Sequence, residues 1–141
     1  MGKLRVIAVV YMLILLAAAS LNYIPGLTDA EGRAFGVFAL DIYDDLLHVA
    51  SAIWAGVSAA VSSRASRIFL RYFGLLYLTD GLLGLATGSG YLDLGIMNHG
   101  IQHYPLMFKI LANLPHIAGG AFAMYASFRF ERDLRARPAK Q

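Results

Sequence analysis

Two histidines lie inside apolar runs of this chain, and the residues around them are alike. His48 stands in Asp45-Leu-Leu-His-Val-Ala-Ser, and His116 stands in Asn113-Leu-Pro-His-Ile-Ala-Gly. Imidazole binds metal ions, ligates haem iron and exchanges protons near neutral pH. Ionisable side chains inside membrane spans are costly and by default mark functional sites. The pair therefore predicts either a ligand or proton site, or a polar contact that stabilises the packing of two helices.

Three aspartates could support such a site. Asp44 and Asp45 precede His48 by about one helical turn, from where a carboxylate can orient an imidazole and raise its basicity. Asp80 stands alone in another apolar run, so we expect it to face the interior of a helix bundle. It is either a protonated, hydrogen-bonded carboxyl or a cation or proton site, with Tyr77 or a histidine as its partner.

The same residues also have a structural interpretation. Asp41 can cap a helix, with a second aspartate three residues later completing a capping box. Asn113 is a good cap for a later helix, and Pro115 is tolerated in a first turn. Three uses of His48 and His116 stay open: hydrogen bonds to helix ends, a metal or proton-linked site, and axial ligation of a haem.

A second histidine pair is a weaker metal site. His99 and His103 have the spacing of helical metal ligands, but Gly100 and Pro105 weaken a helix there and no acidic third ligand is close. The chain has no cysteine, which excludes disulfides and thiolate sites. It also has no nucleotide-binding loop, esterase elbow or zinc-protease motif. We therefore expect a protein that is not an enzyme.

The composition indicates a membrane protein. Of 141 residues, 58% are hydrophobic and 15% are charged, whereas a soluble domain carries about 25% charged residues. Lipid requires helices or closed barrels, and none of the apolar runs alternates as a barrel strand does. The predicted fold is a single all-α domain over residues 1–141, a bundle of four transmembrane helices. The predicted spans, each near the ~20 residues that cross a bilayer, are Val6–Leu21, Ile42–Val61, Ile68–Thr87 and Leu114–Phe130.

The basic residues predict the orientation. Ten of the twelve lie at or near the start of the first run, the junction of the second and third, or the end of the fourth, and only Arg33 and Lys109 lie in the other two connections. Both termini are then cytoplasmic, as expected for a multi-pass protein of the bacterial cytoplasmic membrane. The basic tail, residues 131–141, contacts anionic lipid rather than nucleic acid. Residues 106–111 resemble an interfacial segment on the outer surface.

An alternative reading of the first run stays open. Lys3 and Arg5, the apolar stretch and Ala17-Ala18-Ala19 also fit a signal peptide with a cleavage site. Its removal would leave three spans, and would break the internal symmetry described next.

The two halves of the chain are similar at a fixed offset. His48 and His116 are 68 residues apart, and the same offset superimposes Tyr23 on Tyr91 and Gly32 on Gly100. We expect duplicated hairpins, residues 1–67 and 69–135, related by a pseudo-twofold axis along the membrane normal. The histidines then lie at equal depth. Because one half has an aspartate where the other has an asparagine, a shared site would be chemically asymmetric.

Small residues at helical spacing predict close packing of the third and fourth helices, within the chain or against a partner. The positions concerned are Gly84, Gly88, Gly119, Gly120, Ala123 and Ser127. Together with the absent catalytic motifs, they favour a structural or accessory subunit that assembles with itself or with a larger membrane complex. The alternative function is a haem-, metal- or proton-binding membrane protein built on the candidate residues His48, His116, Asp44, Asp45, Asp80 and Asn113.

Several segments resemble one family. Ile-Pro-Gly-Leu-Thr-Asp at 24–29, Phe-Gly-Val-Phe-Ala-Leu-Asp at 35–41, the motif around His48 and the glycine-rich third run resemble the DUF4383 family of bacterial four-span membrane proteins. An Asn-x-x-His-x-x-x-Gly pattern is met by Asn113, His116 and Gly120, while the first half departs with Asp45 and Ala52. The resemblance implies four spans and supplies no activity.

Overall fold

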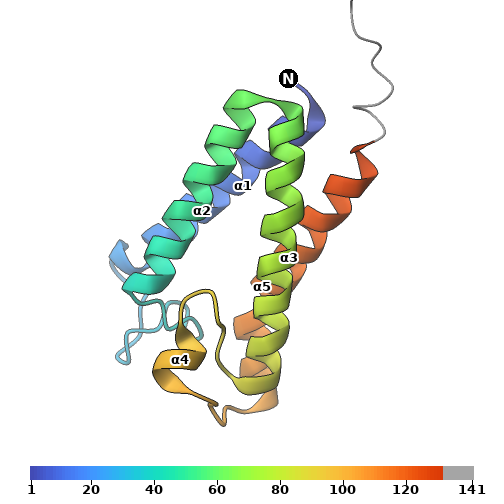
Figure 1. Ribbon diagram of the computed structural model, residues 1–141. Coiled ribbons are helices and arrows are strands. Elements are labelled where there is room, and N and C mark those ends of the chain that lie inside the picture. Colours follow the sequence, from blue (N-terminus) through green and yellow to red (C-terminus); the bar gives the residue numbers. More distant parts are fainter. Residues whose placement is uncertain (132–141) are drawn as a thin grey trace, which may run out of the picture.

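The computed structural model describes residues 1–131, so the predicted tail lies outside the described residues except for Glu131. The described chain is helical, without a β-strand (Figure 1). Its elements are α1 (Lys3–Ser20), the short 3-10 helix η1 (Leu21–Tyr23), α2 (Ile42–Val61), α3 (Ser63–Thr87), α4 (Gly95–His99) and α5 (Leu106–Arg129).

The helices form two antiparallel hairpins. α1 packs on α2, α3 packs on α5, and α3 also borders both members of the first hairpin. The N-terminus, the tight turn at Ser62 and the end of α5 lie at one end of the bundle, while the loop before α2 and the segment holding α4 lie at the other (Figure 1). The core of alanine and leucine side chains contains an aromatic cluster in which Tyr11, Phe73 and Phe69 contact one another. Trp54, which is partly exposed, packs edge-on against Phe69.

Three helices are long and apolar enough to cross a membrane: α1 with η1, α3 and α5. Their length and composition are consistent with a membrane protein. α2 has 20 residues but is not among the three, because Asp44, Asp45 and His48 stand near its start and lower its hydropathy. The fourth crossing stays a prediction.

The start of α2 is as predicted. The Asp41 side chain accepts hydrogen bonds from the amides of Tyr43 and Asp44, and Asp44 Oδ2 accepts from the Asp41 amide. This reciprocal pair is a capping box with aspartate in place of glutamate. α3 begins at Ser63, earlier than predicted, because Ser62 caps it by accepting from the Ala65 amide.

The start of the last helix was predicted wrongly. α5 begins at Leu106, so residues 106–111 are its first turns and not a separate interfacial segment. Asn113 is no cap, because it lies inside the helix and donates to the Lys109 carbonyl. Pro115 lies well inside α5. A proline removes one backbone hydrogen bond, and the apolar residues on both sides of it sustain the helix.

Basic residues at two places stabilise the end of the bundle where the N-terminus lies. Arg5 donates to the carbonyls of Ala59 and Ala60 at the end of α2, where a helix carries partial negative charge. Arg67 and Arg71 of α3 pair with Glu131, just beyond α5. Some of the basic residues that predict the orientation therefore also stabilise the helix ends.

Glycines bring α3 and α5 into backbone contact. A Cβ built on Gly120 would lie 2.8 Å from the Gly74 carbonyl oxygen and 2.9 Å from Cα of Leu78. A Cβ on Gly84 would likewise meet the Asn113 side chain. Both contacts are closer than real Cβ atoms allow, and because Gly120 meets backbone atoms, only glycine there permits this helix separation.

The other predicted packing residues divide into two groups. Ala123 and Ser127 are fully buried, as predicted. Gly119 has no atom within 4 Å of its would-be Cβ, so its predicted packing role within the chain is wrong. Gly88 ends α3 with a positive φ of 80° and packs against Gln102 of the following loop, so it is a helix-ending residue and not part of the helix contact.

Gly120 and Gly119 provide a matched test of this contact. We expect Gly120→Ala to lower the free energy of unfolding by about 1–3 kcal/mol, because the added methyl must push two backbones apart. Gly119→Ala should change it by no more than about 1 kcal/mol, and in the stabilising direction, since alanine favours helix. Unfolding in mixed detergent micelles measures both, and equal effects would contradict the packing described.

Candidate functional site

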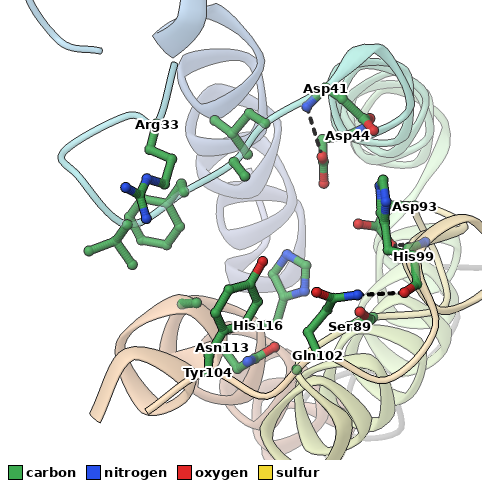
Figure 2. Close-up of a pocket in the computed structure, with 18 of the residues that line it drawn as sticks. Arg33, Asp41, Asp44, Ser89, Asp93, His99, Gln102, Tyr104, Asn113 and His116 are labelled. Carbon is green, nitrogen blue, oxygen red and sulfur yellow. Dashed lines mark hydrogen bonds between the residues drawn. The ribbon is translucent and has the colours of Figure 1, made fainter. Parts of the chain in front are cut away.

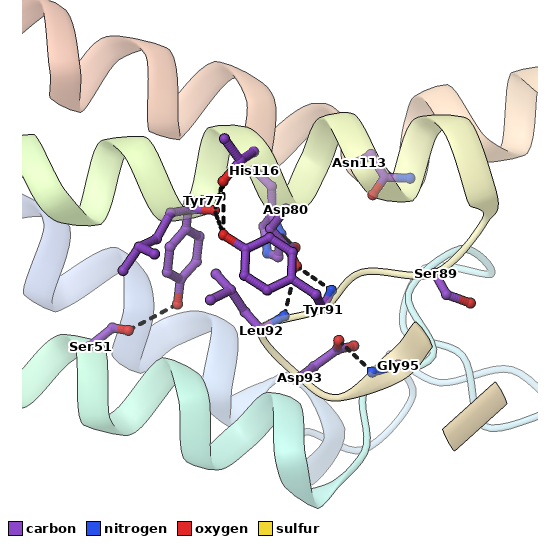
Figure 3. Close-up of polar contacts among 12 residues, drawn as sticks. Ser51, Tyr77, Asp80, Ser89, Tyr91, Leu92, Asp93, Gly95, Asn113 and His116 are labelled. Carbon is purple, nitrogen blue, oxygen red and sulfur yellow. Dashed lines mark hydrogen bonds and ion pairs between the residues drawn. The ribbon is translucent and has the colours of Figure 1, made fainter. Parts of the chain in front are cut away.

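Asp80 is the centre of a buried polar cluster in α3. Its side chain is 3% exposed, and its Oδ2 lies 2.7 Å from Nδ1 of His116. Its Oδ1 accepts hydrogen bonds from the amides of Tyr91 and Leu92, at 2.7 and 2.9 Å (Figure 3). The predicted inward orientation and histidine partner are therefore present. One carboxylate connects α3, α5 and the loop after α3.

His116 is oriented by this contact. A carboxylate only accepts hydrogen bonds, so with Asp80 ionised Nδ1 of His116 carries the proton and Nε2 of the neutral ring is a proton acceptor. Among the described residues Nε2 has no hydrogen-bond partner. Tyr77 packs edge-on against the imidazole, with 4.9 Å between ring centroids, and its hydroxyl bonds Ser51 instead of Asp80. This arrangement is that of a positioned base.

His48 lies beside His116. Their ring centroids are 6.2 Å apart with the planes inclined at 64°, so the two apolar runs do bring the histidines together. His48 is 7% exposed, and its Nδ1 has no hydrogen-bond partner. A buried polar atom without a partner costs about 1–3 kcal/mol, so contacts within the fold do not account for the burial of this nitrogen.

Both histidines line a cavity of about 340 Å³ at the end of the bundle where the two long loops lie (Figure 2). α2, α3 and α5 contribute its inner wall, and the loops close it. Such a volume accommodates a small molecule. Its polar lining includes Arg33, Asp41, Asp44, His48, Asp80, Asp93, Gln102, Asn113 and His116, and its aromatic lining is Phe38, Tyr104 and Phe108.

The one arginine of this lining is held by its own loop. Arg33 pairs with Asp29 at 3.4 Å and Glu31 at 3.5 Å, and its guanidinium lies over the Phe108 ring. The hydrogen bond from the Arg33 amide lowers the pKa of Asp29 below its ordinary value, so that partner stays charged. These contacts compensate most of the positive charge that Arg33 would otherwise present to the cavity.

Not every predicted residue joins the site. Asp45 lies outside the cavity lining and accepts a hydrogen bond from the Tyr23 hydroxyl, which ties α2 to the end of α1. His99 lines the cavity as the last residue of α4, but Gly100 ends that helix, so His103 is not one turn further along it. The two histidines therefore do not share a helix, and Gly100 interrupts it as the sequence indicated.

The geometry offers few metal ligands. Within residues 1–131, no three histidine, aspartate or glutamate side chains are grouped so that they could hold a metal ion. His48 and His116 supply two ligands, whereas a structural zinc site uses four.

Residues from the loops complete the cavity, and the sequence reasoning missed them. Asp93 is the clearest case, because its Oδ1 accepts from the Gly95 amide at the cavity wall. It is the only acidic residue between positions 88 and 113, and this isolation could have marked it as a candidate site residue. Phe38 and Tyr104 gave none, because loop residues have no periodicity to reveal the side they face.

Comparisons of the chain with protein-family models, curated proteins and solved structures find no match. The geometry of the site is therefore the basis for inferring its function.

Asp80 can be tested through stability. We expect Asp80→Ala to cost about 3–5 kcal/mol, because the His116 ring and two backbone amides each lose their acceptor. Asp80→Asn should cost less, since its amide oxygen can still accept from Tyr91 and Leu92. Tyr77→Phe, which loses one neutral hydrogen bond, should cost about 1 kcal/mol. Unfolding in detergent would refute this role if the alanine variant were no less stable than Tyr77→Phe.

Proposed function

We propose that this chain is a non-enzymatic accessory protein of the bacterial cytoplasmic membrane. It binds a small ligand in its outward cavity, and binding is linked to the protonation of His116. The observation that carries the proposal is the Asp80–His116 pair, which orients a free ring nitrogen beside His48 at a cavity that a ligand can occupy.

The burial pattern of α2 supports a fourth crossing. This helix exposes Ile53 and Val57, at 60% and 56%, while it buries Asp44, His48 and Ser51. Polar residues that face the bundle, with apolar residues facing outward, are typical of a helix surrounded by lipid. α2 also packs antiparallel along α1, which is itself apolar enough to cross a membrane.

Duplication is part of the same proposal. The first helices of the two hairpins end at Ser20 and Thr87, and the second helices end at Val61 and Arg129. The second pair of ends is separated by the same 68 residues as the histidines. Two hairpins of one origin would explain why His48 and His116 meet.

The absence of cysteine from the chain makes its topology testable by labelling. Met97 in α4 is 79% exposed, and Arg64 lies next to the turn between α2 and α3. If both termini are cytoplasmic, Met97→Cys reacts with a membrane-impermeant maleimide in intact cells. Arg64→Cys should react only after lysis. The reverse pattern would overturn the proposed orientation.

The proton-linked role rests on the groups that face His116. These are Asp80 and Tyr77 from α3, His48 and Asp44 from α2, and Asp93 from the loop. Three of them are acidic, so the imidazole of His116 lies among carboxyl groups at the cavity wall. A ligand entering the cavity changes those surroundings, and the protonation of the imidazole must respond.

Nitrogen NMR of the histidine rings tests this role. In the neutral form of the ring, we expect the proton of His116 to lie on Nδ1 and Nε2 to be bare. Asp80→Asn should yield mixed tautomers in the neutral ring, and His103→Gln, outside the cavity, should leave the His116 signal unchanged. A neutral His116 with its proton on Nε2 would remove the free acceptor on which the proton-linked function rests.

A further inference from the structure

We infer that the ligand of this cavity is a small organic cation, a protonated amine that carries at least one N–H. This inference rests on the proposed function only in assuming that the cavity binds a ligand. It follows from the charge of the wall, from the aromatic rings and from the unpaired nitrogen of His48.

The charge of the lining is negative. Asp41, Asp44, Asp80 and Asp93 face the cavity, and Arg33 is its only arginine or lysine. Asp80 is compensated by His116 and two amides, and Asp41 by the start of α2. Asp44 and Asp93 each bind one backbone amide through a single oxygen, and the other oxygen has no partner among the described residues. A cation is therefore favoured over an anion.

Aromatic rings lie across the cavity from these carboxylates. Figure 2 shows Tyr104 across the open space from Asp44 and Asp93, and Phe38 and Phe108 also line the cavity. The Arg33 guanidinium, 6.0 Å from the Phe108 ring centroid, already uses one aromatic face as a cation does. Rings facing carboxylates suit an ammonium group, which is attracted to both.

His48 adds an independent requirement for a hydrogen bond. Its side chain is more than nine-tenths buried, lines the cavity, and has an Nδ1 with no partner. A ligand with an N–H can donate to a neutral imidazole nitrogen, whereas a quaternary ammonium cannot. A metal ion is disfavoured, because the described carboxylates and histidines are not grouped in threes at metal-binding positions.

Calorimetry on the full chain in lipid nanodiscs tests this assignment, with three probes of equal length: butylammonium, butanol and butyrate. At neutral pH we expect saturable binding of butylammonium, weaker binding of butanol and none of butyrate. Tetramethylammonium, which has no N–H, should bind more weakly than butylammonium. Equal binding of butylammonium and butyrate would overturn the inference, and so would preference for the neutral alcohol.

Matched aspartate variants locate the binding. Asp44→Asn and Asp93→Asn should each weaken butylammonium binding roughly tenfold, the effect of one nearby charge. Asp45→Asn, the next residue on α2 but outside the cavity, should not. If Asp44→Asn is destabilised through its capping role, Asp93→Asn in the loop still decides, and an unchanged affinity there contradicts the site.

The two proposals fail separately. If His116 has the expected tautomer but no ammonium probe binds, the cation inference is overturned and the proton site stands. If butylammonium binds and Asp93→Asn weakens it, while His116→Gln removes no pH dependence of binding, the cation site is supported and the proton linkage is lost.

Discussion

The buried carboxylate of Asp80 is the interaction on which the rest of the site depends. A charge inside an apolar bundle is tolerated only with partners, and Asp80 has three: an imidazole and two backbone amides. The imidazole comes from α5, and both amides come from the loop after α3. The same contacts that make the charge tolerable also fix the loop after α3 and orient His116, so stability and the candidate chemistry have one cause.

Around that carboxylate the molecule buries polar residues and exposes apolar ones. α2 makes the point most clearly, since its inward side carries Asp44, His48 and Ser51 while its outward side is aliphatic. In water this distribution would be unfavourable, whereas in lipid it is required. The cavity lies where polar side chains of the loops, such as Arg33 and Asp93, meet those of the helices, such as Asp44 and His116.

The sequence predicted the helices well where residues close together in the chain determine their bounds. The bounds of α2 follow from its capping box and its apolar length, and Asp80 had to face inward because its charge allows nothing else. The start of α5 could not be found this way. Pro115 favours a first turn, yet the helix continues through it because packing against α3 outweighs one lost hydrogen bond. Which loop residues reach the cavity depends on tertiary contacts and has no local signal.

The glycine contact between α3 and α5 also bears on how a ligand reaches the cavity. Gly74 and Gly120 lie backbone to backbone, and the side chains of Ile117 and Asn113 fill the space beside Gly81 and Gly84. Close packing of this kind resists separation, so the contact between α3 and α5 keeps Asp80 and His116 at a fixed spacing. If the cavity binds a ligand as proposed, entry past the loops that line it requires no separation of these two helices.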